Sequence, residues 1–446
     1  MINLLDKPAV SRDSETPLAG NYFVSAYPPF SCWQALNGTE PGRLIDNLSV
    51  STKTEPLGLY IHIPFCTVRC SYCYYLSYPH RSEAEIDKYV DTLIREIEIY
   101  SQMNDLTDRK VNFVYFGGGT PSLLSGKQIG VLLDGLKKRF PWTEVQEVSF
   151  ECSPKTLTET KLKTLRQGGV TRISLGIQQL NDAVLKKNGR VHLIQDVERA
   201  YEMINRVGFD AVNVDLMVGL IGESERTFWD SLQRVIGMNP DSVTIYQLEM
   251  PKNTPLYRLY DGGRLDAAPC SWPVKRSRLA KGFARLEVAG YRLRSAYTAG
   301  RTPSGMQFLY QDAQYHGADL LGIGVSAFSY LAGIHYQNKT SLKSYIQKLD
   351  EGQLPIERFH VLSDAERLVR EFVLQLKLGE VSRQYFKNKF HVDICKLFLK
   401  SINSFVGLGL LVKDGDRLSL TRDGLLQVDE ILPEFYLAEH RGIRYS

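Results

Sequence analysis

The sequence has few cysteines and no long apolar run. Seven of its 446 residues are cysteine, and Cys32, Cys152, Cys270 and Cys395 stand alone, unlike the dense, paired cysteines of a disulfide-rich secreted domain. No segment reaches the roughly 18 consecutive apolar residues of a membrane span, and the first residues lack the basic start and apolar centre of a signal peptide. We therefore expect a cytoplasmic protein with no membrane partner.

A strong excess of one charge is also missing. The formal net charge is +4, from 54 basic and 50 acidic residues. Composition therefore indicates no polyanionic partner, and we expect no nucleic acid to bind. With 43% hydrophobic residues, the chain can bury a substantial core in one large domain with one or two smaller ones.

Apolar runs of strand length alternate with amphipathic runs of helix length between residue 57 and about residue 250. The expected helices include 83–103, 194–208 and 224–238. The expected strands are 57–64, 111–117, 147–152, 172–178, 212–220 and 242–250. Six such strands joined by right-handed helical crossovers predict an α/β fold, a partial (β/α)6 barrel.

The chain divides into four expected parts. These are an N-terminal arm (1–54), the partial barrel (55–300), a Gly-rich segment that covers its open side (301–361) and a C-terminal domain (362–446). The last part has the order of elements that is typical of a winged helix. Its expected recognition helix, "DICKLFLKSINSF", is mostly apolar, which favours packing against the barrel or lid duty over DNA binding.

Three further cysteines follow the first expected strand, in "YIHIPFCTVRCSYC". The spacing of Cys66, Cys70 and Cys73 lets one loop aim three thiolates at one metal centre. A structural zinc site needs a fourth ligand, for which His62 is the nearest candidate. A four-iron cluster with three protein ligands would instead keep one iron open to a small molecule.

Other polar features follow the next three expected strands. "GGGTPS" (117–122) comes after the second strand, Glu151 ends the third, and Gln178 ends the fourth. Because parallel barrels carry their chemistry at the carboxyl ends of their strands, we expect these features and the cysteine loop to meet on one face.

These motifs together resemble the radical S-adenosylmethionine (SAM) superfamily. Within it they resemble the branch of oxygen-independent coproporphyrinogen III oxidase, heme chaperones, and class C methyltransferases and cyclopropanases. The resemblance extends from about residue 20 to 435 and includes "VYFGGGTPSLLS", "FECSPKTL", "RISLGIQQLNDAVLKKNGRVH", "VNVDLMVGL" and "DLLGIGVSAFSY". It implies a 4Fe-4S cluster on Cys66, Cys70 and Cys73, an external electron donor, and SAM cleaved to a 5'-deoxyadenosyl radical that abstracts hydrogen from a small-molecule substrate.

The resemblance also implies a set of SAM-binding residues. Backbone groups of Gly117, Gly118 and Gly119 would contact the methionine part of SAM, because glycine permits a close approach, and Thr120 would add a hydroxyl. Positions in the matching motifs that would contact this SAM or its neighbour are Glu151, Gln178, Arg190 and Asp215. A second SAM molecule, which members of this branch can bind, would border Gln247 and Ser326.

The resemblance leaves several candidates for catalysis. Tyr60 matches a tyrosine beside the cluster, and Arg190 and Glu249 complete the expected catalytic set. Further candidates for proton transfer, besides Glu249, are His316, Tyr246 and Cys32.

Departures from the family pattern guide the expected function. Tyr75 stands where the oxidase has a fourth cysteine. Chaperone sequences begin almost directly at the first strand, whereas this chain has an N-terminal arm before that strand, including the aromatic segment 20–34. We therefore expect a radical SAM C-methyltransferase or cyclopropane synthase that uses a second SAM as one-carbon donor to an sp2 carbon of an aromatic or unsaturated natural product. The alternative is a heme- or porphyrin-related protein: a heme chaperone, an anaerobic heme-degrading methyltransferase or the oxidase.

Overall fold

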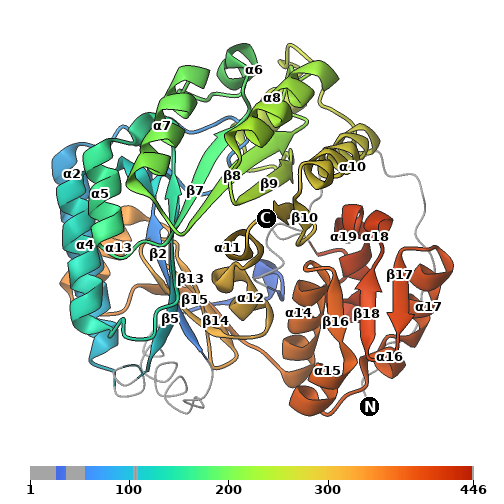
Figure 1. The fold of residues 1–446 in the computed structure, drawn as a ribbon. Helices are drawn as coiled ribbons and strands as arrows, with labels where there is room; N and C mark the ends of the chain where they lie inside the picture. Colours follow the sequence, from blue (N-terminus) through green and yellow to red (C-terminus); the bar gives the residue numbers. More distant parts are fainter. Residues whose placement is uncertain (1–26, 37–55, 104–105, 107–108, 444–446) are drawn as a thin grey trace.

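The computed structural model of the protein describes residues 27–36, 56–103, 106 and 109–443 (Figure 1). Most of the expected N-terminal arm, including the aromatic residues before Tyr27, therefore lies outside the described residues.

The six expected strands form one side of a large mixed sheet. They are β2 (Leu57–Ile63), β5 (Val111–Gly118), β6 (Glu147–Cys152), β7 (Arg172–Gln178), β8 (Ala211–Val218) and β9 (Ser242–Gln247). Each pairs in parallel with the next in this order. The predicted partial barrel is confirmed.

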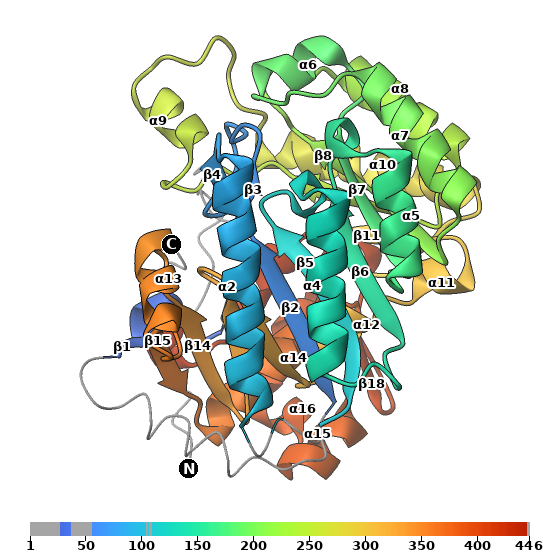
Figure 2. The same cartoon turned by 90° about the vertical axis from the view of Figure 1, so that its left-hand side faces the viewer.

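Helices cover the outer face of these strands, and Figure 2 shows three of them, α2, α4 and α5, side by side. They are α2 (Glu83–Ser101), α4 (Gly126–Arg139), α5 (Glu159–Gln167), α6 (Asp182–Lys187), α7 (Ile194–Val207) and α8 (Glu225–Met238). Helix α2 begins with a capping box, in which Ser82 and Glu85 satisfy backbone N–H groups at the helix start.

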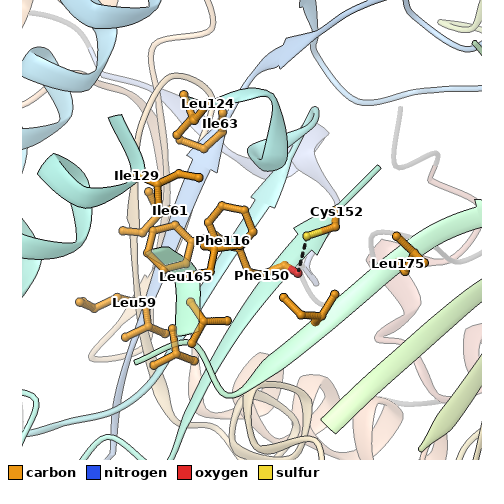
Figure 3. Packing of buried hydrophobic residues seen from close by; sticks show 14 of the residues in the cluster. Leu59, Ile61, Ile63, Phe116, Leu124, Ile129, Phe150, Cys152, Leu165 and Leu175 are labelled. Atoms are coloured by element: carbon orange, nitrogen blue, oxygen red, sulfur yellow. Dashed lines mark hydrogen bonds between the residues drawn. The ribbon is translucent and has the colours of Figure 1, made fainter. Parts of the chain in front are cut away.

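The apolar core lies between the strands and these helices (Figure 3). Alternate residues of β2, namely Leu59, Ile61 and Ile63, meet Phe116 and Phe150 from the neighbouring strands. All are fully buried, and each such side chain contributes roughly 1.5–3 kcal/mol of burial free energy. None of the described helices is both long and apolar enough to cross a membrane.

The sheet continues beyond the barrel on the β2 edge. Strand β12 (Asp319–Ile323) pairs with β2 in parallel, followed by the antiparallel strands β13 (Phe328–Leu331), β14 (Ile334–Asn338), β15 (Ile356–Val361) and β1 (Gln34–Ala35). At the other edge, β11 (Thr298–Gly300) pairs with β9, and β10 (Arg292–Leu293) pairs with β11. The remaining elements of this region are β3 (Phe65–Cys66), β4 (Tyr78–Pro79), α9 (Pro255–Asp261), α10 (Trp272–Val288), α11 (Pro303–Met306), α12 (Leu309–Tyr315) and α13 (Leu342–Asp350).

The C-terminal part is a bundle of helices around a three-stranded sheet, coloured red in Figure 1. Its own core contains the packed rings of Phe372, Phe386, Phe398 and Phe435. Its elements are α14 (Asp364–Leu376), β16 (Glu380–Ser382), α15 (Arg383–Phe390), α16 (Ile394–Leu397), α17 (Leu399–Gly407), β17 (Leu411–Asp414), β18 (Arg417–Leu420), α18 (Arg422–Leu426) and α19 (Val428–Ile431).

Candidate functional site

The cysteine loop leaves the carboxyl end of β2 and is anchored on both sides. Cys66 ends β3, which pairs with β4, and the backbone N–H and hydroxyl of Ser71 both donate to the carbonyl oxygen of Asn188 at 3.1 Å. The N–H of Cys73 donates to the carbonyl of Cys70 at 3.1 Å, which closes a turn. The loop therefore has a defined path over the end of the barrel.

The three thiols lie close enough to influence one another. Burial raises the pKa of the Cys66 thiol, and burial together with Cys70 raises the pKa of Cys73 to about 12. Such thiols keep their protons in the free protein, so a strongly bound cation is needed to displace them. Among the described residues no three His, Cys, Asp or Glu side chains already share metal-binding geometry, so the thiols must turn toward a common centre on loading.

His62 does not complete a zinc site with these cysteines. Its Nδ1 lies 3.2 Å from the hydroxyl of Tyr60, and its ring lies beneath Gly118. Burial lowers the pKa of His62 to about 4. Among the residues that the structure describes, the donor set therefore consists of three thiols without a fourth ligand, which fits a 4Fe-4S cluster with one open iron better than a closed zinc site.

The glycine run lies directly against the cysteine loop. The N–H of Gly119 donates to the carbonyl of Ile63 at 2.7 Å, and a Cβ on Gly119 would lie 2.7 Å from the carbonyl oxygen of Phe65. Gly118 has φ +112°, and a Cβ there would lie 2.7 Å from the ring of His62. Both positions therefore require glycine. The Thr120 hydroxyl donates to the Cys66 sulfur at 3.5 Å.

Two half-buried carboxylates lie on the neighbouring strands β6 and β8. Glu151 accepts a hydrogen bond of 2.6 Å from the Tyr115 hydroxyl, and burial raises its pKa to about 7. Asp215 accepts from the Ser174 hydroxyl at 3.0 Å and the Asn213 amide at 2.7 Å, and burial raises its pKa to about 6. These groups suit recognition of hydroxyls or of a cationic ligand.

Arg190 connects the cysteine loop to β7. Its guanidinium donates to the carbonyl of Gly176 at 2.6 Å and to the Cys70 sulfur at 3.4 Å, and its buried Nε has no hydrogen-bond acceptor. At the end of the same strand Gln178 has φ +64°, where the register with β8 shifts. Backbone strain of this kind is common at functional sites.

One cavity of about 560 Å³ contains part of this site and extends well beyond it. Tyr60, Glu151 and Asp215 line the end near the cysteine loop. Aromatic rings form much of the wall: Tyr115 stacks on Tyr310 with centroids 4.2 Å apart, and Phe30 stacks on Phe328 at 5.0 Å. The cavity is therefore suited to a flat, largely apolar ligand.

The other predicted residues lie at different distances from this cavity. Ser326 and Tyr246 line it, whereas Gln247 and Glu249 are not among its lining residues. Gln247 is buried, and its Oε1 has no hydrogen-bond donor. Burial raises the pKa of Glu249 to about 8, with Asp429 adding repulsion. The structure thus does not bring Gln247 and Ser326 together at the cavity.

Two candidates for proton transfer lie elsewhere. His316 is exposed, and its ring packs edge-on against Tyr385 of the C-terminal part. Cys32 is half-buried in the short described N-terminal segment, and it is not among the cavity-lining residues. Neither is positioned to reach the cavity in this structure.

Sequence reasoning missed the basic side chains of the cavity. They are Arg172, Arg294, Arg358, Arg370 and Lys377. Only Arg172 gave a signal, as a charged residue that opens the apolar run "RISLGIQ". The others belong to elements outside the β/α repeat.

Comparison with known proteins agrees with this geometry. Residues 60–235 match the Radical SAM superfamily, and residues 362–426 match the HemN C-terminal domain. The chain is 28% identical over 378 residues to the heme chaperone HemW of Bacillus subtilis, covering 84% of this chain and 98% of that protein. It is 29% identical over 417 residues to the oxygen-independent coproporphyrinogen III oxidase of Pseudomonas aeruginosa, covering 88% of each.

A solved structure is also similar throughout. The coproporphyrinogen III oxidase HemN from Escherichia coli, described as a radical SAM enzyme, superimposes with a TM-score of 0.80 at 25% identity, covering 93% of this chain and 96% of that one.

These similarities correct the expected function. The prediction of a C-methyltransferase or cyclopropane synthase with an aromatic natural-product substrate is wrong, because the relatives are heme chaperones and coproporphyrinogen oxidases. The expected alternative, a heme- or porphyrin-related protein, is the one that they support. The prediction depended on two departures from the family pattern, Tyr75 in place of a cysteine and the aromatic segment 20–34, and most of that segment lies outside the described residues.

Proposed function

We propose that the chain, whose residues 60–235 match the Radical SAM superfamily and which is similar to HemN over most of its length, is a radical SAM protein whose substrate is a tetrapyrrole, either a heme or a porphyrinogen. The superfamily implies a 4Fe-4S cluster and SAM. The observation that carries the proposal is the continuous cavity: Glu151 and Asp215 line one end, and aromatic rings and basic side chains line the rest.

In this proposal the residues near the cysteine loop hold the cofactors. Cys66, Cys70 and Cys73 bind the cluster, which when reduced supplies the electron that cleaves SAM to a 5'-deoxyadenosyl radical. The close-fitting backbone of the glycine run (117–119) holds the methionine part of SAM, and Thr120 stays hydrogen-bonded beside Cys66. Gln178 is proposed as a SAM contact because it ends β7, on the same side of the barrel as the cysteine loop.

Electrostatic groups orient SAM within the same end of the cavity. Glu151 and Asp215, once ionised, would attract its cationic groups or accept from its ribose hydroxyls, and Arg190, beside Cys70, would bind its carboxylate. Tyr60 stacks on Tyr115 at 6.0 Å and so continues the aromatic wall to this end. A second SAM is part of the proposal only at Ser326, whose hydroxyl accepts from Gln337 at 3.0 Å.

With the cluster and SAM bound, this site would supply hydrogen-abstracting chemistry to the bound tetrapyrrole, and an external reductant would reduce the cluster. The aromatic wall excludes water and holds the macrocycle by its faces, so that a peripheral carbon is presented to the SAM end.

Heme delivery is the second candidate, and it is favoured by the similarity to the Bacillus subtilis chaperone over 98% of that protein. The two candidates share the cavity and differ in whether SAM is consumed in response to the ligand.

The test is anaerobic and uses the cluster-loaded protein with SAM, dithionite and either heme or coproporphyrinogen III. We expect saturable binding of one tetrapyrrole and formation of 5'-deoxyadenosine that increases when it is present. A Cys70→Ala variant should still bind the tetrapyrrole but form no 5'-deoxyadenosine. Tight binding without added 5'-deoxyadenosine would favour delivery, and absence of tetrapyrrole binding would refute both candidates.

A further inference from the structure

The basic residues of the cavity fall into two groups. Arg172 forms an ion pair with Glu147 at 3.1 Å and donates to the carbonyl of Ser304 at 2.7 Å. Arg294 forms an ion pair with Asp312 and donates to the carbonyl of Met306 at 2.9 Å. Their charges are therefore neutralised within the protein, and both hold neighbouring loops in place.

Lys377 and Arg358 form the second group, because neither forms an ion pair with a carboxylate of the described residues. Lys377 is only 6% exposed. Its Nζ lies 5.4 Å from the ring centroid of Tyr297, which also lines the cavity. A buried ammonium group without a counter-charge is costly, so this position favours an anion.

Glu249, an acid that Lys377 influences, does not neutralise Lys377. Glu249 is close enough for Lys377 to attract it, but burial dominates and raises its pKa to about 8. Glu249 is therefore mainly protonated at neutral pH. Glu249 thus offers Lys377 no full counter-charge, and Lys377 lines the cavity.

Arg358 faces the same cavity from the extended sheet. Its register partner across β14–β15 is Gln337, which also lines the cavity and donates to the Ser326 hydroxyl. Directly paired residues of neighbouring strands project from the same face of a sheet. Arg358 is half-buried, so its long side chain can reach a ligand without leaving water entirely.

A third basic residue of the cavity, Arg370, lies between Lys377 and the extended sheet that carries Arg358. It lies seven residues before Lys377 on α14, so both project from one face of the helix. Its guanidinium stacks over the Tyr330 ring at 4.0 Å, and Tyr330 belongs to β13. The cavity wall is thus positively charged from the last turn of α14 toward the sheet.

We propose that Lys377 and Arg358 form a subsite for the carboxylate groups of the ligand. This proposal rests on the proposed function and deepens it: the substrate is a tetrapyrrole with at least two free acid side chains, which the C-terminal domain and the β14–β15 hairpin bind while the rings hold its faces. An arginine suits two-point binding of a carboxylate, and a lysine supplies a point charge.

The experiment compares heme with heme dimethyl ester, which keeps the macrocycle and removes both negative charges. Each is titrated into cluster-loaded protein at pH 7 and followed by its absorbance. We expect Lys377→Met and Arg358→Met to weaken heme binding about 10- to 100-fold, as expected for loss of a hydrogen bond to a charged group. Binding of the ester should change less than about twofold in both variants, on the same reasoning.

Matched variants separate charge from structure. Lys377→Arg should keep most of the affinity for heme, and Lys396→Met, at an exposed lysine of the same domain, should leave it unchanged. Equal weakening of heme and ester binding in Lys377→Met and Arg358→Met would overturn the carboxylate subsite while leaving the tetrapyrrole cavity intact. If the unaltered protein binds neither ligand, the proposed function itself fails.

Discussion

A buried glutamate next to the cavity provides a stability test with a clear sign. Glu96 of α2 is 0% exposed. Its carboxylate accepts from the N–H of Gly324 at 2.8 Å, the Asn338 amide at 2.6 Å and the Tyr345 hydroxyl. These donors come from the loop before Ser326, from β14 and from α13, so Glu96 holds three elements beside the proposed ligand site.

Burial raises the pKa of Glu96 from its ordinary value of 4.5 to about 7. The folded state therefore binds this proton more tightly than the unfolded state does. The resulting stabilisation is complete below pH 4.5 and is lost as the pH rises through 7. At about 1.4 kcal/mol per pKa unit, the loss amounts to about 3 kcal/mol, most of it between pH 5 and 8.

Glu96→Gln removes this titration, so the free energy of urea unfolding should fall less steeply with pH than in the unaltered protein. The difference between the two slopes, summed from pH 5 to 8, should be about 2–3 kcal/mol. Glu83→Gln, at an exposed position of the same helix, is the matched control and should follow the unaltered protein. Parallel pH dependences for Glu96→Gln and the unaltered protein would refute the argument.

Three further outcomes test the SAM end of the site. Cys70→Ala should abolish both iron–sulfur absorbance and 5'-deoxyadenosine formation, and normal SAM cleavage would contradict the cluster assignment. SAM should bind up to about tenfold more tightly as the pH rises from 6 to 8, because Glu151, with its pKa raised to about 7, becomes a carboxylate. In Glu151→Gln the dissociation constant measured by equilibrium dialysis should depend on pH only through Asp215, whose pKa is about 6. Gly118→Ala should weaken SAM binding at least tenfold, since its Cβ would collide with His62; an unchanged dissociation constant would count against the glycine cradle.

The strands of the barrel could be predicted from the sequence because buried parallel strands produce nearly continuous apolar runs. The predicted ranges 147–152 and 172–178 coincide with β6 and β7. The prediction for β9 continued to residue 250, whereas the strand ends at Gln247. Leu248 and Met250 are buried in the following loop, so apolar residues there indicate burial rather than strand, and hydrophobicity alone does not separate the two.

The basic residues that line the cavity could hardly be predicted from the sequence. Arg172, Arg358 and Lys377 belong to β7, β15 and the end of α14, and only the folded chain brings them to one wall. Nothing in the local pattern of a single basic residue distinguishes an inward-facing side chain from a solvated one. The same reason explains why the substrate class was predicted wrongly.

The division of the cavity follows the division of the chain. Glu151 and the cysteine loop lie at the carboxyl ends of strands in the repeated β/α units, and Asp215 lies within one such strand, β8. In such units the spacing in the sequence indicates the position in space. Lys377 and Arg358 come from the non-repeating elements that extend the sheet and pack beside it. The proposed function thus assigns the cofactors to short local motifs and the substrate to residues that only long-range packing brings together. Substitutions at these two basic residues should accordingly alter which tetrapyrrole binds while leaving the cluster and SAM end unchanged.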